Sequence, residues 1–361
     1  MKTALILNFT GNTYHYGCYG TSNEMYHRLV EAGYLVNFIS VRATHSLTVF
    51  PDNGEKFTSA QFANEFLKEN AAIATAIDET DLVVVNGEGT LHRLSKGSMT
   101  LLYLIYLSKQ FMKKRVLLIN HSVFPNGGTE RGDFDGIYKL ALSALDDVVI
   151  REPLSAEFYS SAGIRFRQGF DSLPLYIGRY DLLGIRNEVL DQQKILLCGG
   201  IHYPEAVIKT LVEQLSAYKK DYSFEFVLGG KAHLAQEDAV ICEQFQKAGL
   251  DIKLVTAGSF EHWCRVIASA AVLISGRFHY SIAGLALGVP CITFPSNTPK
   301  VQGVYQLLEE DGYLKWSDTD FENRFKQLLT DALNGELGLS EEKRIMMVEY
   351  AEKNYDLLGV Y

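Results

Sequence analysis

The stretch Asp81-Leu82-Val83-Val84-Val85-Asn86-Gly87-Glu88-Gly89-Thr90-Leu91-His92 decides the fold. Its apolar run ends in a glycine-flanked turn, as expected for a buried strand of a parallel sheet. Similar runs occur at residues 4–8, 35–40, 116–120 and 148–150, and a second series at 195–198, 224–228, 252–255, 272–275 and 291–294. Longer amphipathic stretches separate them, including predicted helices at 24–32 and 59–77. This alternation predicts an α/β fold with parallel sheets.

The chain is long enough for two domains, since 361 residues exceed the usual size of one hydrophobic core. The two series of strands predict two Rossmann-like domains with a cleft between them. We place them at residues 1–178 and 179–339, with residues 176–193 as a linker that mixes charge and glycine. Residues 340–361 are predicted as a C-terminal helix that packs back on the N-terminal domain.

The composition is that of a globular protein, with 47% hydrophobic and 21% charged residues. A net charge of -9 argues against binding nucleic acid or an anionic membrane surface. No run approaches the ~20 apolar residues of a spanning helix, so at most peripheral membrane association is expected. The five cysteines form no C-x-x-C pair, which predicts reduced thiols, a cytoplasmic location and no metal site. Homo-oligomer formation stays open.

The strongest candidate site is Gly276-Arg277-Phe278-His279, directly after a predicted strand and at the start of a predicted helix. Ligands of parallel α/β sheets bind at the carboxyl ends of strands. Arginine, histidine and a helix start together favour an anion, and the imidazole can move a proton near neutral pH. The alternative is that Arg277 pairs with a surface acid while His279 caps or fills the helix start.

Three further residues follow strands of the same series. Asn297 and Lys300 either face the same cleft or form a simple turn. Gly229-Gly230-Lys231 could cradle phosphate oxygens with backbone N–H groups and the lysine. The spacing of a P-loop or of a dinucleotide-binding glycine motif is absent.

In the first half, Glu88 lies between Gly87 and Gly89 and before Thr90. The glycines let the backbone approach a ligand, and the carboxylate could bind acceptor hydroxyls or act as a base. The alternative is a tight turn with a solvated glutamate.

Arg151 also follows a strand, and could give the same anion a second guanidinium. Alternatively Arg151 and Glu152 are an ordinary surface pair.

Taken together, these motifs resemble the ordered signature of the polysaccharide pyruvyl transferase family. The resemblance rests on Asn86–His92, Arg151-Glu152 with Ser155, Phe170-Asp171, Ser275–His279, Gly288-Val289-Pro290 and Lys300. It implies two Rossmann-like domains of the glycosyltransferase-B type, with the acceptor on the N-terminal side and the donor on the C-terminal side. Where the family has an Asn-x-Gly-Asp-like turn after the first strand, this chain has Tyr16–Ser22 instead, which bears on acceptor recognition.

The implied activity is transfer of a pyruvyl group from phosphoenolpyruvate to a sugar or lipid-linked oligosaccharide, giving a pyruvate ketal without a cofactor. Arg277 and Arg151 would bind the donor, and His279 would be the general acid. With Glu88 as a second catalytic residue, we assign substrate binding to Gly276, Phe278, Gly87, Gly89, Thr90, Asn297, Lys300 and Lys231. The rival hypotheses are a glycosyltransferase that uses a nucleotide sugar and a sugar-binding protein without activity.

Overall fold

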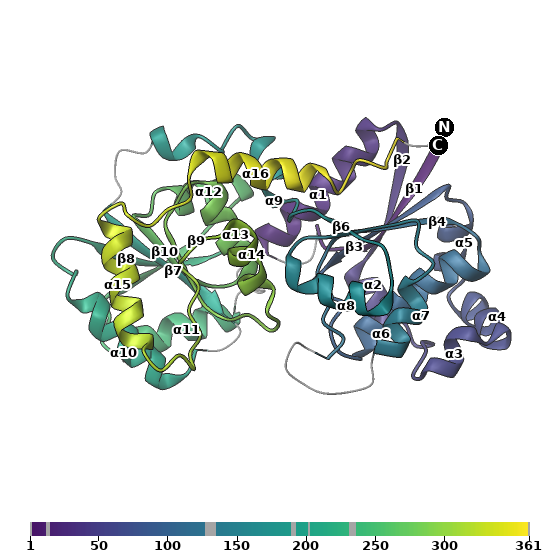
Figure 1. The fold of residues 1–361 in the computed structure, drawn as a ribbon, viewed down its shortest axis with the longest axis horizontal. Helices are drawn as coiled ribbons and strands as arrows, with labels where there is room; N and C mark the ends of the chain where they lie inside the picture. The colour runs from purple at the N-terminus through teal and green to yellow at the C-terminus, as the bar shows by residue number, and fades with distance from the viewer. Residues whose placement is uncertain are drawn as a thin grey trace. The chain divides into compact units, whose positions relative to one another are not determined.

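The computed structural model describes residues 2–11, 15–126, 135–188, 193–200, 203–230 and 236–359. They fold into two compact units, each with its own parallel sheet (Figure 1). Unit 1 comprises the described residues of 2–11, 21–172 and 350–359, and unit 2 those of 15–20 and 173–349. The predicted α/β fold class with two parallel sheets is confirmed. The change of unit after Ser172 falls a few residues before the boundary predicted at 178.

The sheet of unit 1 has the strand order β2-β1-β3-β4-β5-β6, and all its pairs are parallel. Its strands are β1 (Lys2–Phe9), β2 (Tyr34–Ser40), β3 (Leu82–Glu88), β4 (Arg115–His121), β5 (Asp147–Ile150) and β6 (Arg167–Gln168). The chain runs from β1 outward to β2 and then returns to β3 on the other side of β1. The carboxyl ends of β1 and β3 therefore form the switch point of this sheet, where parallel sheets bind ligands.

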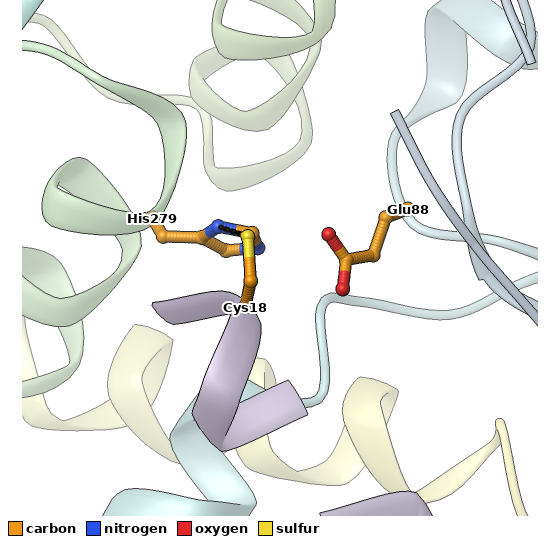
Figure 2. Close-up of side chains that lie close together, drawn as sticks. All are labelled: Cys18, Glu88 and His279. Atoms are coloured by element: carbon orange, nitrogen blue, oxygen red, sulfur yellow. Dashed lines mark hydrogen bonds between the residues drawn. The ribbon is translucent and has the colours of Figure 1, made fainter. Parts of the chain in front are cut away.

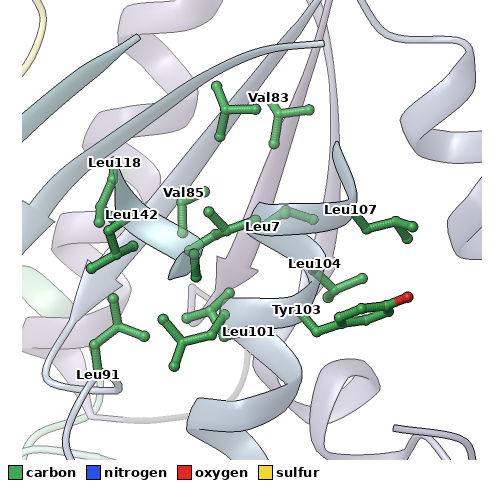
Figure 3. Packing of buried hydrophobic residues seen from close by; sticks show 14 of the residues in the cluster. Leu7, Val83, Val85, Leu91, Leu101, Tyr103, Leu104, Leu107, Leu118 and Leu142 are labelled. Carbon is green, nitrogen blue, oxygen red and sulfur yellow. The ribbon is translucent and has the colours of Figure 1, made fainter. Parts of the chain in front are cut away.

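Helices of unit 1 cover the sheet and supply its core (Figure 1). They are α2 (Val41–Ser46), α3 (Gly54–Thr58), α4 (Ala60–Glu69), α5 (Ala71–Asp78), α6 (Lys96–Tyr106), a π-helical turn (Leu107–Phe111), α7 (Asp135–Leu142), a 3-10 turn (Pro153–Ser155) and α8 (Ala156–Ala162). Figure 3 shows Leu7, Val85 and Leu118 of three neighbouring strands in one buried cluster with Leu101 and Leu104 of α6. This apolar layer fixes the strand ends in place.

The sheet of unit 2 has the order β11-β10-β7-β8-β9, again with parallel pairs. Its strands are β7 (Lys194–Gly200), β8 (Ser223–Leu228), β9 (Ile252–Thr256), β10 (Val272–Gly276) and β11 (Cys291–Thr293). The chain passes from β7 to β8 and β9, and then returns to β10 on the opposite side of β7. The switch point of this sheet lies at the carboxyl ends of β7 and β10.

The helices of unit 2 flank this second sheet. They are α9 (Leu173–Gly178), a 3-10 turn (Ile185–Glu188), α10 (Glu205–Ser216), α11 (Gln236–Lys247), α12 (Phe260–Ala268), α13 (Phe278–Ala286), α14 (Lys300–Leu308) and α15 (Phe321–Leu333). Within α9, Leu173–Ile177 are buried, so the predicted linker starts inside a packed helix. Among the described residues, no helix is long and apolar enough to cross a membrane.

Two helices contain a change of unit. Helix α1 (Tyr16–Glu31) belongs to unit 2 up to Gly20 and to unit 1 from Thr21, while α16 (Glu341–Glu352) changes to unit 1 at Tyr350. The prediction that the first helix begins at residue 24 was wrong by two turns. The helix predicted at 59–77 is also two helices, because the chain breaks at Asn70 between α4 and α5.

Candidate active site

The Gly276–His279 motif lies at the switch point of the sheet of unit 2. Gly276 ends β10 and pairs with Gly200 at the end of β7, after a shift in register that follows Ile274. A Cβ atom on Gly276 would lie 2.7 Å from the Cα of Gly200, closer than real Cβ atoms come. The glycines therefore let the two strand ends meet directly under the motif.

Arg277 caps the start of α13 and forms an ion pair inside unit 2. Its Nη2 donates to Oδ1 of Asp238 over 2.6 Å, and the Asp238 side chain is fully buried. Burial lowers the pKa of Arg277, but the charge and hydrogen bond of Asp238 outweigh it and raise the pKa above its ordinary value. The shorter ion pair of Arg277 is thus with a buried acid of α11, and the exposed Glu237 of the same helix lies farther away, with its Oε2 3.9 Å from Nη2. Gly199 makes room for that carboxylate, since a Cβ there would lie only 1.8 Å from Asp238 Oδ1.

His15, just before α1, is a second imidazole near Arg277. Burial, followed by the positive charge of Arg277, lowers the pKa of His15. The neutral ring is therefore favoured, and its Nδ1 is buried without a hydrogen-bond partner among the described residues. A neutral imidazole beside a guanidinium can hold a ligand by a hydrogen bond without adding charge.

His279 lies in the first turn of α13 with its ring against the first turn of α1. Its Nδ1 lies 3.6 Å from Sγ of Cys18, the dashed contact in Figure 2. Hydrogen bonds to sulfur are longer than those to oxygen, so a contact of 3.6 Å is within hydrogen-bonding range. Nδ1 is therefore the ring nitrogen that faces the thiol.

Phe278, Asn297 and Lys300 also come together in unit 2. Nζ of Lys300 donates to Oδ1 of Asn297 over 2.6 Å and lies 5.8 Å from the centre of the Phe278 ring. Lys300 starts α14 and is mostly buried, so these residues form more than a surface turn. The structure brings six predicted residues to one end of this sheet: Gly276, Arg277, Phe278, His279, Asn297 and Lys300. Lys231 lies outside the described residues.

Glu88 lies at the switch point of the sheet of unit 1 and is the acidic side chain in Figure 2. Its side chain is buried, and one oxygen, Oε1, accepts three hydrogen bonds. The donors are Thr10 Oγ1 at 2.5 Å, Asn86 Nδ2 at 3.0 Å and Thr21 Oγ1 at 3.2 Å. The alternative of a solvated glutamate was wrong. The three donors fix the carboxylate through one oxygen and orient the other.

Three neighbouring strands of unit 1 end in left-handed backbone. The φ angles are 63° at Asn8, 39° at Glu88 and 51° at Asn120. Such conformations cost energy in residues with a side chain, and they gather at functional sites. Side chains compensate here: Asn8 donates to Oγ1 of Thr90, and Asn120 donates to Oδ1 of Asn86.

The glycines flanking Glu88 have separate roles. A Cβ atom on Gly87 would lie 2.3 Å from the Cβ of His121 on β4, so this position requires glycine. The carbonyl of Gly89 accepts a hydrogen bond from Nδ1 of His92, which closes the turn after β3. Both glycines thus shape the backbone on which Glu88 is carried.

Arg151 follows β5 and is only 1% exposed. Its Nη1 donates to Oδ2 of Asp171 over 2.7 Å, and its Nε donates to Oγ of Ser122 over 3.0 Å. Glu152 instead accepts from the backbone N–H groups of Leu154 and Ser155. The alternative of an ordinary surface pair was therefore wrong, because both side chains are buried and bonded elsewhere. Donor binding by Arg151 stays a prediction.

Sequence reasoning missed Asp238, His15 and Cys18. Asp238 follows a predicted glycine loop at a helix start. Nothing in the sequence distinguishes it from the other Asp and Glu residues, 43 in all, as the partner of Arg277. Cys18 and His15 lie in or beside the tyrosine-rich stretch that was interpreted as a loop. Glycines at positions 17 and 20, three apart on one helical face, were the available signal.

Solved structures with the same architecture define the class of fold. Anabaena HepE, solved in complex with UDP and glucose, matches with a TM-score of 0.54, 12% identity and coverage of 98% of this chain and 95% of that one. Neisseria meningitidis UDP-GlcNAc 2-epimerase bound to UDP-GlcNAc matches with a TM-score of 0.57 and 11% identity, over 99% of both chains. Arabidopsis thaliana UGT89C1 complexed with quercetin matches with a TM-score of 0.51 and 10% identity, over 99% of this chain and 95% of that one. The chain therefore has two Rossmann-like domains of the glycosyltransferase-B type.

The sequence narrows this class to one family. The family model described as polysaccharide pyruvyl transferase matches residues 21–298, which include Glu88, Arg151, Arg277 and His279. The chain belongs to the polysaccharide pyruvyl transferase family, and it is accordingly a transferase of polysaccharide biosynthesis. A search of curated proteins found no match.

Proposed function

We propose that this protein transfers the pyruvyl group of phosphoenolpyruvate to a sugar of a surface polysaccharide or of its lipid-linked precursor, forming a pyruvate ketal. One observation carries the proposal beyond the family: Arg277 and His279 lie two residues apart at the N-terminal turn of α13, at the switch point of their sheet. This arrangement combines an anion site with a proton donor, which are the two needs of phosphoenolpyruvate chemistry.

The donor carries a phosphate and a carboxylate, and unit 2 offers cations for both. Arg277 is held in place by buried Asp238, and Lys300 is held by Asn297. The N–H groups at the start of α13 add the positive end of the helix dipole. Arg151 of unit 1 is proposed as the second guanidinium of the donor site.

His279 acts as the general acid in this proposal. Its proton passes to the methylene carbon of phosphoenolpyruvate, so that the CH2 group becomes a methyl group and C2 becomes electron-poor. A sugar hydroxyl forms a bond to C2 and loses its proton. The C2–O bond to phosphate then breaks, and a second hydroxyl of the same sugar attacks C2 and loses its proton. The products are the cyclic ketal and inorganic phosphate, and no cofactor is required.

Glu88 is proposed as the base that takes a hydroxyl proton from the acceptor. Its Oε1 is engaged by Thr10, Thr21 and Asn86, so Oε2 is the oxygen that we assign to the acceptor. A fixed carboxylate can orient a sugar hydroxyl and accept its proton.

The direct test is incubation of the protein with phosphoenolpyruvate and a panel of glycosides, followed by mass spectrometry. We expect an acceptor product heavier by one pyruvate ketal, together with released phosphate. His279→Ala should abolish turnover and leave donor binding nearly unchanged. Normal turnover by His279→Ala would contradict its role as the acid.

The test of Arg277 needs a control, because Arg277→Ala leaves the buried carboxylate of Asp238 without its cation. The double variant Arg277→Gln/Asp238→Asn replaces both charges with groups that can still hydrogen bond. Its donor affinity should fall by about 2–5 kcal/mol in calorimetry, as for loss of a hydrogen-bonded charge contact. Unchanged affinity in this variant would remove Arg277 from the donor site.

The second candidate is a glycosyltransferase that uses a nucleotide sugar. It is favoured by the fold, since the Anabaena structure was solved with UDP and glucose. Thermal-shift titration separates the two functions. Stabilisation by phosphoenolpyruvate and not by nucleotide sugars supports pyruvyl transfer, and the reverse result would overturn it.

A further inference from the structure

The start of α1, residues 16–20, packs within unit 2 together with His15 and is fixed there at its beginning. The backbone N–H of Tyr16 donates to the carbonyl of Gly229, just after β8, over 2.7 Å. The phenol of Tyr16 donates to the carbonyl of Ala257, just after β9, over 3.0 Å. Two strand ends of the sheet therefore fix where α1 starts.

The same turn is tied at its far end by close packing. A Cβ atom on Gly20 would lie 2.7 Å from Leu173 Cδ1 of α9 and 3.1 Å from Phe260 of α12. The ring of Tyr19 also lies 5.8 Å from the ring of Tyr176 and 6.2 Å from that of Phe260, measured between centroids. Residues 16–20 are thus held on both sides by unit 2.

Between these anchors, two residues of the turn contact the His279 side chain. Gly17 lies so close that a Cβ atom there would be 2.1 Å from the Cβ of His279. The thiol of Cys18 lies 3.6 Å from Nδ1, the ring nitrogen next to Cγ (Figure 2). Since the turn is anchored at both ends, the orientation of the ring follows from the position of this turn.

We infer that Cys18 is a positioning residue for His279. Its thiol holds Nδ1, so that Nε2 is the nitrogen that delivers the proton to the donor. In the protonated ring, Nδ1–H donates to the sulfur while Nε2–H points to the substrate. After proton transfer, Nδ1–H remains bonded to the sulfur, and the ring keeps the orientation needed to be reprotonated at Nε2. This inference rests on the proposed role of His279 as the acid.

Cys18 also differs from the other cysteines of the chain. Cys18 is half-buried, whereas Cys198, Cys242, Cys264 and Cys291 are buried, and none of the five is in a disulfide. A thiol reagent should therefore reach Cys18 first, which gives a chemical test of the same contact.

The test is a comparison of Cys18→Ala, Cys18→Ser and the wild-type protein by ¹⁵N NMR of histidine-labelled protein, with His279→Gln to assign the ring signals. We expect a single ring tautomer in the wild type and a mixture in Cys18→Ala. Cys18→Ser, which keeps a hydrogen-bonding group, should lie between them. Because this readout needs no turnover, it tests the contact even if phosphoenolpyruvate is not the donor.

The kinetic arm uses phosphoenolpyruvate as donor. Cys18→Ala should lower kcat about 10-fold to 100-fold and leave KM for the donor within about twofold, because the acid is misaligned and the anion site is intact. Methyl methanethiosulfonate, which forms a methyl disulfide on sulfur and releases methanesulfinate, should inactivate the wild type but not reduce the residual activity of Cys18→Ser.

Cys264→Ala is the matched control, since it removes a buried thiol from α12 without touching His279. It should change thermal stability but neither the tautomer nor the ratio of kcat to KM. A Cys18→Ala protein with the wild-type tautomer and wild-type kcat would overturn the inference. So would equal changes in the tautomer of His279 in Cys264→Ala.

Discussion

Replacing Gly17 with alanine should move His279 and slow catalysis. The new Cβ atom would lie 2.1 Å from the Cβ of His279 and 2.5 Å from its Cγ, where ordinary contacts begin near 3.4 Å. The two groups must therefore separate by roughly 1.3 Å, and a displacement of about 1 Å at a catalytic group can cost about 100-fold in rate. We expect kcat to fall by about that factor.

Gly17→Ala should also change the stability of the protein. Overpacking typically costs about 1–3 kcal/mol, and exchange of glycine for alanine in a helix returns up to about 1 kcal/mol. The expected net loss in the free energy of unfolding is therefore about 0–3 kcal/mol. Phosphate release from phosphoenolpyruvate and thermal unfolding, measured on the same preparation, would separate the two effects.

Gly136 provides a matched control, because it is also the second residue of a helix, α7. A Cβ atom there would meet no atom within 4 Å, so Gly136→Ala should stabilise the protein by about 0.4–1 kcal/mol and leave kcat unchanged. If Gly17→Ala kept wild-type kcat, or if both variants lost activity equally, the close contact with His279 would not govern catalysis.

Three further predictions concern unit 1. Asp171→Asn should cost about 3–5 kcal/mol in urea unfolding, because it leaves the buried guanidinium of Arg151 without its anion; a loss below about 1 kcal/mol would argue against this pair as a stabilising contact. Burial and the charge of Arg151 lower the pKa of His121 from 6.5 to about 3, so its contribution to stability is complete above pH 6.5 and is lost as the pH falls toward 3, by up to about 1.4 kcal/mol per unit. Burial raises the pKa of Glu152 to about 7, so this group lowers the free energy of unfolding as the pH rises from 4.5 to 7, opposite to the effect of His121. The free energies of unfolding of His121→Gln and the wild type must therefore be compared at each pH. Identical slopes of this free energy against pH would contradict the assignment to His121. Glu88→Gln should lower kcat by about 10²-fold to 10⁴-fold while thermal unfolding changes little, since an amide oxygen can still accept the same donors; retained turnover would exclude Glu88 as the base.

The strands were predictable because each is a buried apolar run, and the structure contains a strand at every position where one was predicted. The start of α1 was not predictable from local preferences, since Gly17 and Gly20 disfavour a helix in isolation. Both positions require glycine because of tertiary packing. His279 occupies the space that a side chain on residue 17 would need, and Leu173 that of a side chain on residue 20. Glycines that look like loop residues are here required by close packing.

The positions of the site residues were predictable from topology, because the chain order alone brings Glu88 and Arg277 to the ends of strands. Their partners were not. Arg151 lies next to Glu152 in the sequence, but it pairs with Asp171, twenty residues away. Arg277 likewise pairs with Asp238 from a different helix. Charge pairing depends on the distance between folded elements, which no spacing in the sequence encodes. The predicted cleft between the domains stays a prediction.

The split of α1 at Gly20 limits how this protein can be divided or recombined. A fragment made of residues 173–349 alone would contain His279 but lack Gly17 and Cys18, and its sheet would lose the partner of the Gly229 carbonyl. Exchange of the C-terminal half between family members would likewise combine His279 of one protein with the residues at positions 17 and 18 of another. A productive chimaera must therefore inherit residues 15–20 and 173–349 together, so that two distant stretches of the gene behave as one unit of inheritance.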